Sequence, residues 1–171
     1  MQSNDDAYFV MGVDPPFTSV QIDQGTIENE KFVGTIATFL WGPTAATFIG
    51  QPVDGFIVGK TKGGTALAMT WVRPYASKDA LLAPELTPCP NFQSDESPDE
   101  PHGKAVVFSP PAGKVVYIAS IKFYPTPRGS LASLFHKDIE AARAFMKIHY
   151  PQLADKLENG SYQLIPLARC G

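Results

Sequence analysis

Hydrophobic and polar positions alternate with a period of two along residues 116–124. Successive side chains of a β-strand point to opposite faces of the sheet, so this alternation predicts a strand with one face in a core. The rest of the chain carries a similar pattern, which predicts a protein built mostly of sheet. The alternation would put Val116, Ile118, Ser120, Lys122 and Tyr124 on one face and Tyr117, Ala119, Ile121 and Phe123 on the other.

Further segments rich in β-branched and aromatic residues end at Gly or Pro, as strands do. We expect residues 104–109 to pair with the strand that follows Gly113, and Gln24–Gly25 and residues 62–64 to form turns. The predicted strands are residues 7–13, 17–23, 31–41, 47–49, 55–58, 65–73, 104–109 and 161–167.

Near the C-terminus the apolar spacing changes to three and four residues, which indicates a helix with one apolar stripe. Asp138 can cap this helix, and Pro151 suits the start of a second short helix over residues 152–158, ended by Asn159–Gly160. The stripe consists of Ile139, Ala142, Phe145, Met146 and His149.

Together these patterns predict a mainly β (α+β) fold. We expect an antiparallel β-sandwich or a partly open barrel, with one or two C-terminal helices packed on one face. A length of 171 residues suits a single β-rich domain spanning 1–171. The stretch at about 77–103 is rich in proline and acidic residues, and we expect it to be a mobile loop.

Charge and hydropathy restrict the partners and the location. The net charge is −3 and no basic run occurs, which argues against nucleic acid as a partner. No apolar run approaches the 18 or so residues of a transmembrane segment. The polar, acidic start is not a secretory signal. A short polar leader that runs into a strand favours an exported protein whose signal has been removed, periplasmic or outer-membrane-associated; a cytoplasmic protein is the alternative.

Motifs for catalysis, metals and cofactors are missing. The segment 55–61 resembles a phosphate-binding loop but is one residue short, and a glycine-rich turn follows it instead of a helix. His102, His136 and His149 have no metal-ligand spacing, and a solvated loop explains His102 and its acidic neighbours. The sequence therefore predicts no catalytic residue, no metal ligand and no cofactor.

The chain has two cysteines, Cys89 and Cys170, which are too few for a structural zinc site. An even number of cysteines suits an exported protein, and a disulfide bond between them would tie down the C-terminus. Two separate free thiols are the alternative.

One group of residues could bind a ligand. Trp71, Arg73 and Tyr75 lie within five residues at the end of a predicted strand, and Trp71 and Arg73 would share one face. Such a group can stack on a sugar or pair with an anion. The alternative is that Trp71 belongs to the core and Arg73 covers its rim.

The segment Phe108-Ser-Pro-Pro-Ala-Gly-Lys-Val-Val-Tyr-Ile-Ala119 resembles a strand–turn–strand pattern of small bacterial envelope lipoproteins of unknown function. Residues 138–145 and 150–153 are similar to the C-terminal helix of that family. The resemblance covers about the last third of the chain and implies an envelope protein with a β-sandwich fold. The lipid-bearing cysteine that the family carries at its mature N-terminus is absent here.

Two classes of function follow from these observations. The first is a non-enzymatic binding or interaction protein of the cell envelope, whose partner is a protein, a glycan or a small ligand. The second is a hydrolase whose carboxylates converge only in the fold, which requires a deep pocket with two carboxylates or with a carboxylate and a histidine. The sequence does not determine the ligand or the oligomeric state.

Overall fold

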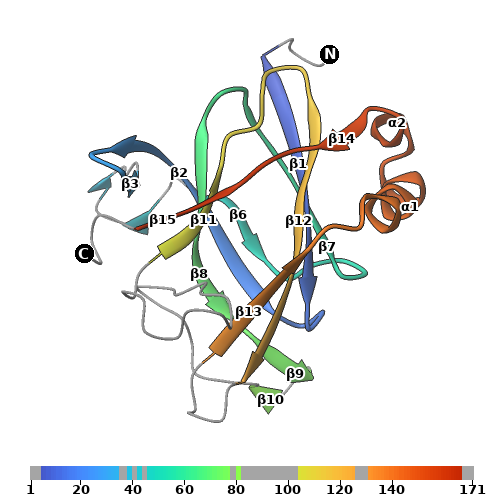
Figure 1. The fold of residues 1–171 in the computed structure, drawn as a ribbon, viewed down its shortest axis with the longest axis horizontal. Helices are drawn as coiled ribbons and strands as arrows, with labels where there is room; N and C mark the ends of the chain where they lie inside the picture. The colour runs from blue at the N-terminus through green and yellow to red at the C-terminus, as the bar shows by residue number, and fades with distance from the viewer. Residues whose placement is uncertain are drawn as a thin grey trace.

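Two β-sheets pack face to face, and two short helices cover the free face of one of them (Figure 1). The computed structural model describes residues 5–34, 38–39, 42–43, 46–77, 80–81, 104–125 and 131–166. The prediction of a mainly β sandwich with short C-terminal helices is confirmed.

The sheet that carries the helices is here called the inner sheet. Its strand order is β13-β12-β1-β7, and β14 also pairs with β12. Strand β1 is antiparallel to β7 and β12 is antiparallel to β13, whereas β1 with β12 and β12 with β14 run parallel. Its strands are β1 (Asp6–Asp14), β7 (Phe56–Lys62), β12 (Val115–Pro125), β13 (Leu131–His136) and β14 (Leu157–Asn159).

The opposite sheet, here called the outer sheet, is antiparallel throughout and has the order β15-β11-β8-β2-β3, with β6 also paired to β2. One sheet is strongly curled. The outer strands are β2 (Ser19–Glu28), β3 (Lys31–Gly34), β6 (Ala46–Gly50), β8 (Ala66–Arg73), β11 (Lys104–Phe108) and β15 (Gln163–Pro166). Two further pairs are β4 (Thr38–Phe39) with β5 (Gly42–Pro43) and β9 (Tyr75–Ser77) with β10 (Ala80–Leu81).

The main core fills the space between the sheets. Strand β1 shows how the alternation builds it: Phe9, Met11 and Val13 point into this core, whereas Val10 points to the other side of the sheet. On the outer sheet, Val20 and Ile22 of β2 face the same core. The period of two in the sequence therefore divides β1 between two apolar layers.

The second core lies between the inner sheet and the helices α1 (Ile139–His149) and α2 (Pro151–Ala154). The predicted helix stripe contributes Ala142, Phe145 and Met146, which pack over Val10, Val115 and Tyr117 of the sheet. Figure 1 shows both helices together beside β14 and β1, on the side of the molecule away from β2 and β3. The inner sheet is thus covered on both faces.

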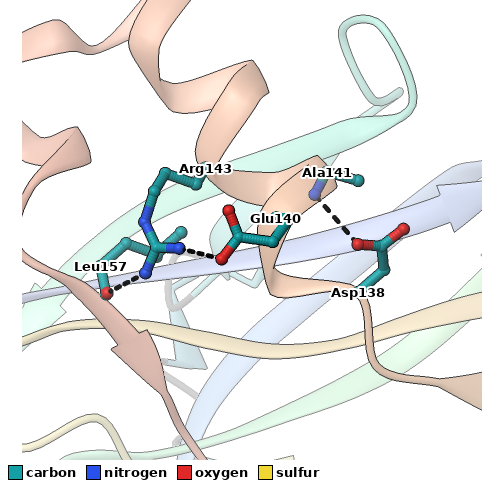
Figure 2. A network of polar contacts seen from close by, with 5 residues as sticks. All are labelled: Asp138, Glu140, Ala141, Arg143 and Leu157. Atoms are coloured by element: carbon teal, nitrogen blue, oxygen red, sulfur yellow. Dashed lines mark hydrogen bonds and ion pairs between the residues drawn. The ribbon is translucent and has the colours of Figure 1, made fainter.

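Polar contacts fix the start of α1, as Figure 2 shows. Asp138 caps the helix as predicted, with its Oδ1 accepting a hydrogen bond from the backbone N–H of Ala141 at 3.1 Å. Arg143 forms an ion pair with Glu140 and donates a hydrogen bond to the carbonyl oxygen of Leu157 at 3.3 Å. Because Leu157 begins β14, these contacts join the helix to the edge of the inner sheet.

Two hydroxyl groups of β12 form a buried pair that also contacts the start of α1. The Tyr117 hydroxyl lies 2.6 Å from the Ser120 hydroxyl and accepts a hydrogen bond from the backbone N–H of Asp138 at 3.1 Å. Lys137 extends over the Tyr117 ring and donates to the carbonyl oxygen of Gly160 at 2.8 Å. Burial lowers the pKa of Lys137 below its ordinary value.

The predicted division of β12 into two faces is wrong beyond Ile118. Val10 pairs with Tyr117 while Gly12 pairs with Ser120, so β12 contains one extra residue there. Such a bulge reverses the phase of the alternation. As a result Val116, Ile118, Ile121 and Phe123 all face the main core.

Other boundaries also differ from the prediction. Strand β2 continues through Gly25 to Glu28, and the turn falls at Asn29 and Glu30, which both have positive φ. Residues 157–159 form β14 instead of a helix, and β13 was not predicted. Residues 80–81, inside the proline-rich stretch at about 77–103, form a short strand.

The pairing expected for residues 104–109 is also wrong. Strand β11 pairs with β8 and β15 in the outer sheet, whereas β12 pairs within the inner sheet. The turn at Gly113 therefore carries the chain from one sheet to the other. The Gly-rich turn at Lys62–Gly64 makes the same kind of crossing, from β7 to β8.

Gly59 provides a test of the packing in the main core. It lies opposite Phe9 in the register of β1 and β7, and a Cβ atom at Gly59 would lie 2.1 Å from the Phe9 ring. Phe9 is fully buried, so the ring has little room to move. We expect Gly59→Ala to lower the free energy of unfolding by about 1–3 kcal/mol in urea denaturation.

The matched control is Gly34→Ala, because the nearest atom to a Cβ at Gly34 lies at 4.0 Å. This variant should change the free energy of unfolding by less than about 0.5 kcal/mol. Equal stability of the two variants would contradict the packing described for Phe9.

Candidate functional site

The solvent side of β2 and β8 brings together the aromatic, charged and amide side chains that are best suited to bind a ligand. In the register of the outer sheet, Gln21 lies opposite Trp71 on one side and opposite Ile49 on the other. Directly opposed residues of an antiparallel pair point to the same face. We name this surface the Trp71 face and define it by Ser19, Gln21, Asp23, Ile49, Thr70, Trp71 and Arg73.

A bulge in β8 places Trp71 on this face. Gln21 pairs with Trp71, but the next residue, Ile22, pairs with Met69, so Thr70 is an extra residue. Met69 and Val72 both point into the main core, and Trp71 is half-buried outside it. A strand of strict period two would put Met69 and Trp71 on the same face. The bulge is therefore what separates Trp71 from the core.

Three polar side chains form a connected network beside Trp71. The Gln21 amide donates to both carboxylate oxygens of Asp23, at 2.9 and 3.0 Å. The Thr70 hydroxyl donates to Asp23 Oδ2 at 2.6 Å. Thr70 is almost completely buried at 4% exposure, so Asp23 supplies the hydrogen bond that its hydroxyl requires. The network fixes the orientation of Gln21 next to the indole ring.

Trp71 and Arg73 share one face, as the sequence predicts. The guanidinium carbon of Arg73 lies 5.1 Å from the centre of the Trp71 ring, within the range of a cation–π contact. Neither of the two apolar clusters among the described residues includes Trp71. Tyr75, the third predicted residue, is half-buried and lies in β9, which pairs with β10 in a separate small sheet.

This face combines an aromatic ring with polar and charged groups. An indole ring offers an apolar surface, and the amide, the carboxylate and the guanidinium beside it accept or donate hydrogen bonds. Nucleophilic catalysis requires a nucleophile within hydrogen-bond reach of a base, and the base in turn oriented by a third group. Asp23 is bonded to an amide and a hydroxyl, with no histidine in the described network.

A histidine–carboxylate pair lies elsewhere, at the surface of the helix layer. His149 Nε2 lies 2.8 Å from Asp54 Oδ2, and the His149 ring packs on Phe145 with ring centres 4.5 Å apart. The side chain of Asp54 is 73% exposed. The pair attaches the end of α1 to the turn before β7. Its surface position does not match the deep pocket that the hydrolase hypothesis requires.

Three further residues singled out in the sequence lie beyond the part of the chain that the structure describes. They are Cys89, Cys170 and His102, and most of the loop expected at 77–103 lies outside the described residues as well. The disulfide bond between the two cysteines therefore stays a prediction.

Metal-binding clusters and membrane-spanning helices do not occur in the described residues. Among the residues that the structure covers, no three His, Cys, Asp or Glu side chains gather in a way that could hold a metal ion. In the same part of the chain, no helix is long and apolar enough to cross a membrane. Comparison with protein-family models, with curated proteins and with solved structures gave no match.

Sequence reasoning missed Gln21, Asp23 and Thr70. Their local sequence does not show that they meet, because Asp23 and Thr70 are 47 residues apart and come together only across the sheet. One signal was available: Gln21 and Asp23 occupy alternate polar positions in a strand whose other positions, Val20 and Ile22, are apolar. That pattern indicates a polar face but does not identify its cross-strand neighbours.

A double-mutant cycle tests the network. Asp23→Ala leaves the buried Thr70 hydroxyl without its acceptor, and Thr70→Val removes the hydroxyl. We expect each change to lower the free energy of unfolding by about 1–2 kcal/mol. The double variant should lose about 1 kcal/mol less than the sum of the two, because it deletes both partners.

Thr26→Val is the control, since Thr26 bonds Glu28 at the exposed end of β2. This change should alter stability by less than about 0.5 kcal/mol. Additive effects of Asp23→Ala and Thr70→Val would show that the two side chains are not coupled.

Proposed function

We propose that this protein is a non-enzymatic binding module of the bacterial cell envelope and that it binds a saccharide on the Trp71 face. The observation that carries the proposal is the placement of Trp71, half-buried and outside both cores, beside Gln21 in the register of the outer sheet. An aromatic ring outside the two apolar clusters, set next to fixed polar groups, is an arrangement that can recognise a sugar ring with its hydroxyls.

The surroundings of Trp71 support a saccharide over a purely apolar ligand. Gln21 and Asp23 give this face an amide and a carboxylate that are oriented by mutual hydrogen bonds. Fixed polar groups of this kind select a ligand by its hydroxyls, and their orientation in advance lowers the entropy lost on binding. Ile49, which is 65% exposed, extends the surface across β6 and provides apolar contact.

The position of this face also supports a binding role. The helices cover the inner sheet, whereas the Trp71 face belongs to the outer sheet, on the far side of the main core. A ligand there would touch strands that are anchored by the main core. Rigid strands hold recognition groups more precisely than loops do.

The envelope part of the proposal comes from the resemblance to envelope lipoproteins. The residues that carry it lie in and before β12 and in α1. Fractionation of cells that express the native gene tests this part separately: recovery in the periplasmic or membrane fraction supports it, and recovery in the cytosol contradicts it.

Binding to a panel of immobilised oligosaccharides tests the saccharide proposal. We expect Trp71→Ala to weaken binding by about thirtyfold, which corresponds to the roughly 2 kcal/mol that truncation of a central aromatic ring costs. Trp71→Phe keeps an aromatic surface and should lose less. Circular dichroism of both variants checks that the sheets remain folded.

Tyr150→Ala is the matched control. Tyr150 is an exposed aromatic residue, at 37%, but it lies at the end of α1 on the helix side of the molecule. Its loss should leave binding unchanged. The proposal fails if no saccharide binds, or if folded Trp71→Ala binds as well as the unaltered protein.

A further inference from the structure

On the basis of the proposed function, we infer that the saccharide is an amino sugar in its ammonium form and that Asp23 is the residue that recognises the charge. The half-buried carboxylate of Asp23, whose described partners are all uncharged, carries this inference. Its charge would set the class of saccharide, which the placement of Trp71 alone does not.

Uncharged donors hold the Asp23 carboxylate in place. The Gln21 amide donates to both of its oxygens, and the Thr70 hydroxyl donates to Oδ2. Among the residues that the structure describes, no cation forms an ion pair with this carboxylate. Arg73 is opposite Ser19, four residues from Asp23 along β2. At about 3.3 Å per residue, these two positions on β2 are about 13 Å apart. The negative charge is therefore fixed in position, and the described part of the chain does not neutralise it.

A positive group on the ligand would complete the surroundings of Asp23. The half-buried carboxylate has lost part of its hydration, and charges taken out of water are ordinarily paired with an opposite charge. A hydrogen bond between two charged groups is shorter and stronger than one between neutral groups. A ligand hydroxyl, in contrast, would add only one more neutral donor. The charge of Asp23 therefore favours a saccharide that carries an ammonium group over one that carries hydroxyls alone.

The geometry leaves Asp23 an acceptor within reach of a sugar on Trp71. A carboxylate has about four acceptor sites on its two oxygens. Oδ1 accepts a hydrogen bond from Gln21 alone. Gln21 lies directly opposite Trp71, and Asp23 lies two residues further along β2. That separation is about 7 Å, which one sugar residue packed on Trp71 can span. A hexosamine therefore combines a ring for Trp71 with an ammonium group for Asp23.

The experiment uses glucosamine oligosaccharides, each compared with its own N-acetylated form, which keeps the ring and its hydroxyls but removes the charge. In mildly acidic buffer, where the free amine is protonated, we expect acetylation to lower affinity by about tenfold or more. Asp23→Asn should lower affinity for the amine by a similar factor and leave affinity for the acetylated sugar nearly unchanged. The Asn side-chain oxygen can still accept the hydrogen bond from Thr70, and circular dichroism checks that the variant is folded.

Glu28→Gln is the control for charge, since Glu28 is an exposed carboxylate at the far end of the same strand. It should not change the ratio of amine to acetylated affinity. If the unaltered protein binds the acetylated sugar as tightly as the amine, this inference is overturned but the saccharide proposal stands. Equal weakening of both sugars by Asp23→Asn also overturns it. Failure of every saccharide to bind counts against the proposed function itself.

Discussion

Burial of the inner sheet on both faces governs the packing of this molecule. Strand β1 directs Phe9 and Met11 to the main core and Val10 to the helices, so a single strand supplies two apolar layers. A one-residue slip of such a strand would exchange the two sets and disrupt both cores. The need to keep both sets buried therefore holds β1 and β12 in one register and fixes the position of the helices.

Bulges let these strands satisfy packing and polar requirements together. In β12 the extra residue returns Ile121 and Phe123 to the main core and leaves Ser120 beside Gly12, where a side chain would clash with the serine hydroxyl. The same bulge lets Ser120 reach the Tyr117 hydroxyl, which supports the start of α1. The bulge in β12 thus contributes to the contact between this strand and the start of α1.

The bulge in β8 has a different consequence, because it turns Trp71 away from the core. Met69 and Val72 stay in the core, while Trp71 turns out to meet Gln21 and Arg73. Since the helices cover the other sheet, the two sides of the molecule are specialised: one closes a second core, and the other presents an indole with oriented polar groups. This asymmetry is why we propose a binding role for the Trp71 face and not for the helix side.

The mainly β class, most strand positions, the capped helix and its apolar stripe could be predicted from the sequence, because they depend on local periodicity and on Gly and Pro. The sequence also predicted that Trp71 and Arg73 lie on one face, since residues two positions apart in a strand point to the same side. Tertiary structure alone decided that β11 and β12 belong to different sheets and that Asp23 meets Thr70. Those outcomes depend on which strands pair and where bulges fall, and pairing energy comes from contacts between residues distant in the chain, which no local pattern encodes.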